Sequence, residues 1–146
     1  MSDKTTSSTP WHLWVVGIVG TLWSSIGAFD YTMSQMRNEA YLSGFSPEQI
    51  AYFEGFPTWA IAVWAIGVWG GVLGCLLILM KKKLATSVLS ASFGASFVLT
   101  IYNYGFYDGF VAAGDTFSIV FAIVIVVVAY ALLWYANIQL KRGVLS

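Results

Sequence analysis

Residues 58–83 read TWAIAVWAIGVWGGVLGCLLILMKKK, and this stretch decides the fold. From Thr58 to Met80 it carries no charged residue, and three lysines follow directly. A helix needs roughly 20 mostly apolar residues, at about 1.5 Å rise each, to cross about 30 Å of hydrocarbon. The stretch therefore predicts a membrane-spanning helix that ends where Lys81, Lys82 and Lys83 reach water.

Three further segments have the same character. They cover about 11–30, 84–102 and 117–140. The last contains a β-branched run at 123–128, but lipid forces backbone hydrogen bonds to close within one segment, which favours a spanning helix over a strand. Because the connection through the lysines is short, the second and third spans must be antiparallel neighbours. We therefore expect an all-α integral membrane protein, a single-domain four-helix bundle over 11–140 with up-down-up-down topology.

The composition of the 146-residue chain excludes most soluble classes of protein. Hydrophobic residues make up 58% of the chain and charged residues 10%, whereas a soluble domain carries about 25% charged residues. Seven basic residues balance seven acidic ones, so no basic excess is present for a nucleic-acid partner. One cysteine, Cys75, and one histidine, His12, cannot build a disulfide framework or a closed zinc shell. We expect no metal site.

The few charges are sorted by sign between the two sides of the predicted bundle. One side collects Lys4, Lys81, Lys82, Lys83, Lys141 and Arg142 against Asp3. The other side collects Asp30, Glu39, Glu48, Glu54, Asp108 and Asp115 against Arg37. Because cytoplasmic loops carry an excess of Lys and Arg, the flexible N-terminal segment 1–10 and the C-terminal segment 141–146 are expected to be cytoplasmic.

The external segment between the first two spans contains a helix start signal. Ser46-Pro47-Glu48-Gln49 combines an N-cap serine, a proline at the first helical position and a glutamine at the third, which is a capping-box pattern. Gly55 follows as a residue that can end the helix. The pattern predicts a short amphipathic helix at about 47–54 that lies in the outer membrane interface.

Small residues predict where the helices approach one another, because apolar faces gain little from meeting in lipid. The second span carries the overlapping pairs Gly67-x-x-x-Gly71 and Gly70-x-x-x-Gly74. Their partner is either another helix of this chain or a second subunit, and the sequence leaves both open. The fourth span has no small-residue ridge before Ala129, so we expect it to face lipid most.

Two features inside the spans each allow a structural and a functional interpretation. The hydroxyl groups of the third span are expected to bond to carbonyls of their own or a neighbouring helix, and a polar conduit is the alternative. Trp64 lies on the helix face of Gly67 and Gly71. This ring either fills space or forms a flat slot for a quinone, a pigment or a lipid tail.

Ionisable residues at bilayer depth usually mark function, and no span carries one near its midplane, which argues against an ion-coupled carrier. Polar residues gather instead at the predicted outer boundary: Asp30, Tyr31, Arg37, Glu39, Asn103 and Asp108. They form either a salt-bridged cap or a small binding or docking site. The chain offers no Ser-His-Asp set, phosphate loop or paired carboxylates. We expect no catalytic residues, no enzyme activity and no cofactor.

Several motifs suggest a family. Gly27-Ala28-Phe29-Asp30-Tyr31, the segment 37–42 and Phe56-Pro57-Thr58-Trp59 resemble a group of small four-span proteins of the bacterial inner membrane, often labelled "sugar transporter". The chain is also loosely similar to the DoxX-type four-helix proteins, which are linked to quinone and thiol oxidation. The resemblance implies a four-span fold and a multi-pass protein of the bacterial inner membrane.

Three functions follow as hypotheses. The first is a structural or accessory subunit that packs in the lipid bilayer against other membrane proteins or against itself. The second is an oligomeric carrier of a small or lipophilic solute. The third is a quinone-associated redox subunit of the membrane.

Overall fold

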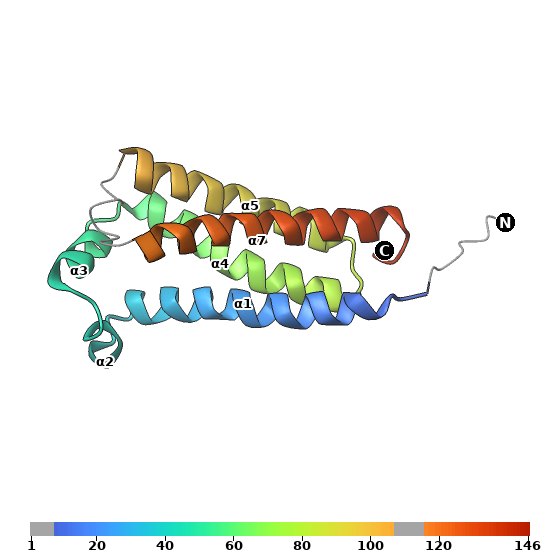
Figure 1. The fold of residues 1–146 in the computed structure, drawn as a ribbon, viewed down its shortest axis with the longest axis horizontal. Helices are drawn as coiled ribbons and strands as arrows, with labels where there is room; N and C mark the ends of the chain where they lie inside the picture. The colour runs from blue at the N-terminus through green and yellow to red at the C-terminus, as the bar shows by residue number, and fades with distance from the viewer. Residues whose placement is uncertain (1–7, 107–115) are drawn as a thin grey trace.

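A computed structural model describes residues 8–106 and 116–146, and four long antiparallel helices make up most of it (Figure 1). These are α1 (Trp11–Gln35), α4 (Thr58–Leu79), α5 (Leu84–Ile101) and α7 (Thr116–Lys141). The π-helical turn η1 (Tyr102–Phe106) continues α5. All four long helices are long and apolar enough to span a membrane, and no strand occurs within the described residues. The predicted all-α four-helix bundle is confirmed.

Two short helices, α2 (Glu39–Leu42) and α3 (Pro47–Glu54), lie at the end of the bundle opposite the start of α1 and the C-terminus (Figure 1). The capping box is confirmed: Ser46 N donates to Gln49 Oε1 at 3.0 Å, and Gln49 N donates to Ser46 Oγ at 3.2 Å. The sequence did not predict α2. Its first turn is capped by Asn38, whose side chain accepts from the backbone N–H of Tyr41.

The first helix continues past its predicted end at Asp30 as far as Gln35. It stops because Arg37 takes a left-handed conformation with φ of 52°. Asn38 N then bonds to Met33 O at 3.2 Å, and Arg37 N bonds to Ser34 O at 3.3 Å, which is a Schellman ending. Asp30 therefore lies within α1, and Arg37 leaves the helix instead of continuing on the face of Asp30.

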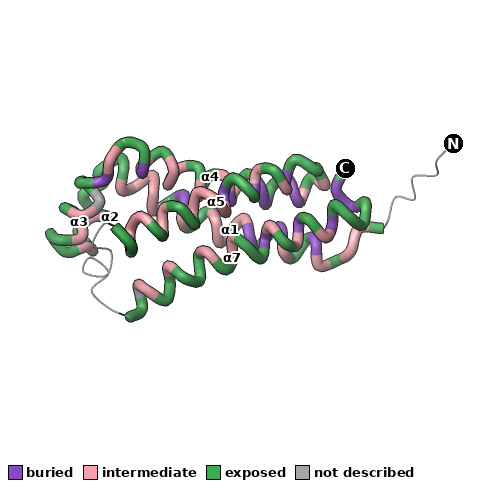
Figure 2. Tube along the Cα trace, turned by 90° about the horizontal axis from the view of Figure 1, so that it is seen from above, coloured by how far each residue is buried: buried purple, intermediate pink, exposed green. Residues whose placement is uncertain are grey.

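The two ends of the bundle differ in how they are packed. We call the end with the turn 81–83 the lysine end, and the end with α2 and α3 the loop end. The buried residues lie mainly toward the lysine end (Figure 2). The core there consists of Leu13, Cys75, Leu77, Ile78, Ala85, Leu89, Leu132, Ala136, Val144 and Leu145. Backbone bonds of Ser146 to Lys81 and Lys83 hold the last two core residues in place.

Glycines of the lysine end receive large side chains from neighbouring helices of the same chain. Gly17 on α1 packs against Leu79, and Gly74 on α4 packs against Leu89, so tightly that neither site has room for a Cβ atom. A Cβ on Gly20 would lie 2.7 Å from the Sγ of Cys75. Helix α4 thus packs its glycine face against α1 and α5 within one chain.

Helix α7 is the most exposed of the four, as the sequence predicts. Only 11% of its most apolar stretch is buried, against 17% in α5 and more in the other two. Its extensive packing is with α5, whereas it meets α1 through individual side chains such as Leu132 beside Gly20. Toward the loop end its backbone stands apart from the other helices (Figure 2).

Candidate binding cavity

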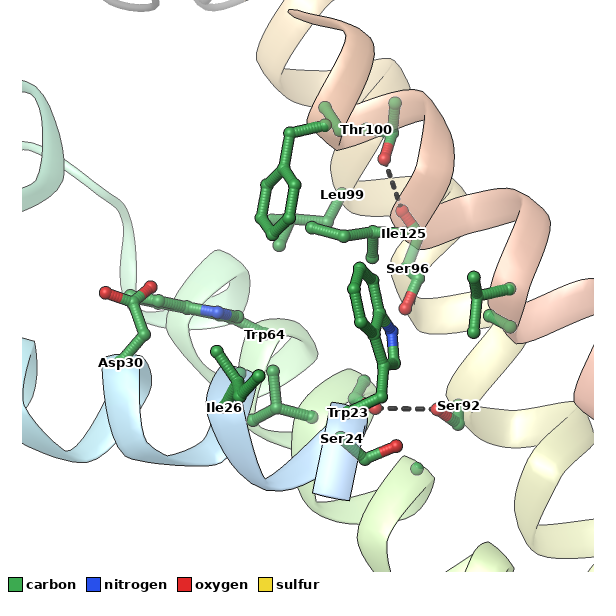
Figure 3. A pocket seen from close by; sticks show the side chains of 18 of the residues that line it. Trp23, Ser24, Ile26, Asp30, Trp64, Ser92, Ser96, Leu99, Thr100 and Ile125 are labelled. Carbon is green, nitrogen blue, oxygen red and sulfur yellow. Dashed lines mark hydrogen bonds between the residues drawn. The ribbon is translucent and has the colours of Figure 1, made fainter. Parts of the chain in front are cut away.

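A cavity of about 710 Å³ lies between the four long helices, mainly in their loop-end halves, and reaches Leu89 and Leu132 of the core (Figure 3). Its wall runs along α1 from Trp23 to Asp30 and along α5 from Leu89 to Thr100, which corresponds to about 16 Å of helix on α5. Most of the lining is hydrocarbon and aromatic ring. Ligand pockets typically measure about 300–1,000 Å³, so this volume suits a small molecule.

The cavity exists because small side chains face one another across it. Gly67 and Gly71 line it from α4, Ser96 from α5, and Ala122 and Ala129 from α7. In the lysine-end half the corresponding glycines are covered by leucines. Toward the loop end α7 diverges from the other helices, and the small residues leave the space unfilled.

Two hydroxyl groups of α5 that line the cavity, those of Ser92 and Thr100, donate their protons to main-chain carbonyls. Ser92 Oγ donates to Gly67 O across the helix interface at 2.6 Å, and Thr100 Oγ1 donates to Ser96 O at 2.8 Å (Figure 3). Ser90 likewise donates to Thr86 O at 2.7 Å. The expected bonding to own-helix and neighbouring carbonyls is confirmed, and these hydroxyls do not supply free donors for a polar conduit.

At the loop end, two phenol groups bind two polar residues of the cavity rim. The Tyr41 hydroxyl of α2 donates to the Asp30 carboxylate of α1. The Tyr52 hydroxyl of α3 donates to Asn103 Oδ1 at 2.7 Å, in the π-helical turn after α5. All four side chains line the cavity at its loop end, which we call the rim. These two hydrogen bonds hold α2 and α3 against the long helices.

The environment of Tyr41 keeps its hydroxyl protonated. Burial, followed by the hydrogen bond to Asp30 and the negative charge of that carboxylate, raises the pKa of Tyr41 above its ordinary value of 10.0. The phenol therefore stays neutral through the physiological range. It remains a donor to Asp30 wherever the carboxylate is ionised.

Aromatic rings surround Asp30 on both sides. Tyr41 packs edge-on against Phe29 with ring centroids 5.6 Å apart, and against Phe45 at 5.4 Å. Trp64 packs edge-on against Tyr31 at 5.0 Å. Farther into the bundle, the Trp23 indole stands in the cavity (Figure 3). Trp23 also meets Phe121 of α7, with ring centroids 5.7 Å apart.

The structure brings together only part of the candidate set from the sequence. Asp30 and Asn103 line the same cavity, and Tyr31 lies behind Trp64. Arg37 lines a separate small pocket of about 90 Å³, and Glu39 is exposed on α2. Asp108 lies outside the described residues.

Trp64, Gly67 and Gly71 all line the cavity, and the slot for a ligand stays a prediction beside the space-filling role of the ring. Sequence reasoning missed Tyr41 and Tyr52. Both belong to short helices whose docking against the bundle has no local signal in the sequence. The π-helical turn that carries Asn103 has no such signal either.

His12 and Cys75 lie away from the cavity. His12 Nδ1 lies 2.6 Å from the Tyr135 hydroxyl, and Cys75 is fully buried beside Gly20. Cys75 thus belongs to the core of the lysine end. Within residues 8–106 and 116–146, no group of three or more His, Cys, Asp or Glu side chains is placed to hold a metal ion.

Comparison of the chain with protein-family models, curated proteins and solved structures found no match. The cavity combines a long apolar interior, small residues on three helices and one carboxylate at the rim. This arrangement can enclose the apolar body of a molecule and hold a polar head at the loop end.

Proposed function

We propose that this protein binds one lipophilic small molecule in the loop-end cavity and carries or presents it within the membrane. The observation that carries the proposal is the cavity, with about 710 Å³ inside a mostly hydrocarbon wall and polar side chains at one end. A bundle of this length gains stability by filling such a space with side chains, because each unfilled volume removes van der Waals contacts. A ligand restores those contacts.

The charge distribution supports one orientation of the protein in the membrane. The lysine end carries Lys81, Lys82, Lys83, Lys141 and Arg142, and the loop end carries most of the acidic residues. With positive residues inside, the lysine end is cytoplasmic and the cavity rim faces the opposite side. In the bacterial inner membrane, the location implied by the sequence resemblance, the ligand reaches Asp30 from the periplasmic side.

A lipophilic ligand fits the wall better than a sugar. A sugar requires many polar side chains to replace its hydration, whereas here Ser92, Thr100 and Tyr52 already donate to protein acceptors. An accessory-subunit function is supported by the exposed apolar face of α7, but lipid covers such a face equally well. The cavity is the feature that favours ligand binding.

Mass spectrometry of the purified protein tests the proposal. The full chain is isolated in mild detergent, washed, and extracted with organic solvent. We expect one small-molecule species in about equimolar amount with wild type. Ala129→Phe places a ring in the cavity from α7 and is expected to abolish this co-purification.

Ala131→Phe is the matched control, since Ala131 is exposed on the same helix and does not line the cavity. It is expected to retain the molecule. Equal retention by both variants, or a wild-type extract no different from detergent and bulk lipid, would contradict the proposal. Stoichiometric recovery of a second protein in place of a small molecule would favour the subunit function.

A further inference from the structure

We infer that the molecule held in this cavity is an amphipathic cation, with a positively charged head at Asp30 and an apolar body along α4, α5 and α7. The inference rests on the proposed function and adds the chemical class of the head group. Lipophilic amines, quaternary ammonium compounds and phosphonium compounds belong to this class.

The charge of the lining is the first observation. Asp30 is the one charged side chain among the described residues that line the cavity, and no lysine, arginine or histidine joins it there. An ionised carboxylate in a largely apolar wall is costly unless a positive charge or donors accompany it. Arg37, the basic residue of the described loop end, lines a different pocket. A cationic ligand supplies the missing partner.

The hydrogen bonds of the rim are the second observation. Tyr41 has one hydroxyl proton and donates it to Asp30, and Tyr52 donates its own to Asn103. An ionised Asp30 can only accept. These three side chains therefore keep lone pairs but no uncommitted proton. An ammonium group, or the polarised C–H groups of a quaternary cation, would meet complementary charge at these three side chains, whereas the rim donors open to a quinone carbonyl are the amide N–H groups of Asn103 and Gln49.

The rings are the third observation. Phe29, Tyr41, Phe45 and Trp64 all line the cavity on the same rim as Asp30. The face of an aromatic ring attracts a cation within about 6 Å of its centroid, and tryptophan does so most strongly. A carboxylate among several rings is a site suited to a large, weakly hydrated cation.

The surface around the rim is the fourth observation. Glu39, Glu48 and Glu54 are exposed on α2 and α3, so with Asp30 and Arg37 the described loop end carries a net charge of −3. A surface of one sign raises the local concentration of ligands with the opposite sign. This field favours cations before they reach the cavity.

Binding of a matched pair of probes tests the inference. Methyltriphenylphosphonium is a lipophilic cation, and triphenylphosphine oxide is a neutral molecule of similar shape. Binding of each to the full chain in detergent is measured by quenching of tryptophan fluorescence, because Trp23 and Trp64 line the cavity. We expect wild type to bind the cation about tenfold more tightly than the neutral probe.

Three variants identify the source of the preference. Asp30→Asn is expected to remove it, Asp30→Glu to retain most of it, and Glu39→Gln, an exposed acid outside the lining, to change it by less than about twofold at 150 mM salt. The preference of wild type tests the inference even if Asp30→Asn fails to fold. Equal binding of both probes would overturn the cationic head group and leave the lipophilic cavity standing. Binding of neither probe would overturn the inference, and the extraction experiment on wild type decides the proposed function separately.

Discussion

The two halves of the bundle contain similar helices and pack in different ways. At the lysine end, Leu13 and Ile78 are fully buried, and Leu79 and Leu89 cover the glycines opposite them. At the loop end the same helices enclose a cavity of about 710 Å³. The contrast shows that leucines close the glycine contacts at the lysine end, whereas the glycines that line the cavity are met by shorter side chains and space remains beside them.

The same difference is found between the two halves of helix α4. Gly74 meets a leucine of α5, whereas Gly67 and Gly71 are in close contact with the shorter side chains of serines and also line the cavity. The lysine-end half is therefore suited to hold the helices together, and the loop-end half to exchange a ligand. Four predictions test this division of roles, each by equilibrium unfolding of the purified full chain in mixed detergent micelles.

The largest expected effect is the loss of a core side chain at the lysine end. Ile78→Ala leaves a cavity in a fully buried site and is expected to lower the free energy of unfolding by about 2–5 kcal/mol. Leu99→Ala, in the cavity wall of the loop end, is expected to cost less than half as much, because its new space joins an existing hollow. Equal losses would contradict the division.

The second prediction concerns the bond that ties α2 to the rim. Tyr41→Phe removes the donor to the Asp30 carboxylate and is expected to lower the free energy of unfolding by about 1.5–3 kcal/mol. Tyr130→Phe is the control, since Tyr130 is exposed on the lipid-facing helix α7. A variant at Tyr41 as stable as the control would show that the bond contributes nothing.

The third prediction sharpens the description of the lysine-end core. Gln139 is 1% exposed, and its Oε1 atom has no hydrogen-bond partner among the described residues. Gln139→Met keeps the length of the side chain and removes this atom, so we expect a gain of about 1 kcal/mol. Asn137→Met, at an exposed position of the same helix, should give no comparable gain. If Gln139→Met lowers the free energy of unfolding, the amide of Gln139 stabilises the core, which would contradict the prediction.

The smallest effect separates two hydroxyls of α5. Ser92 donates across the interface to α4, and Ser90 donates to its own helix. Ser92→Ala is expected to cost about 0.6 kcal/mol, the average for interhelical hydrogen bonds in membranes. Ser90→Ala is expected to cost less, because the neighbouring turn already holds its carbonyl in the helix ladder. The reverse order would place the stabilising contact within the helix.

Most of the fold is readable from the sequence because its signals are local. Length and hydropathy predict the four long helices, and Ser46 and Gln49 predict the start of α3. The end of α1 is harder to predict from the sequence. Helices usually end at a glycine in the left-handed conformation, but here Arg37 adopts that conformation. Helix α2 is four residues long, too short to show a periodic pattern.

Only some residues of the candidate site could be predicted from the sequence. Asp30 and Asn103 stand out as polar residues at the ends of apolar segments. Their partners Tyr41 and Tyr52 do not, because a tyrosine in a connecting segment is equally compatible with solvent, lipid interface or site. Arg37 and Glu39 have the same polar signal as Asp30, but the end of α1 directs them away from the cavity.

The sequence by itself determined the class of protein, the four apolar helices and the separation of charge between their ends, because these depend on composition along the chain. Only the tertiary structure decided that the small residues of the loop-end half enclose a cavity and that Tyr41 bonds to Asp30. The physical reason is that a cavity and a long-range hydrogen bond depend on how far apart helices settle. That distance is set by side chains from several helices at once, and no single stretch of sequence contains it.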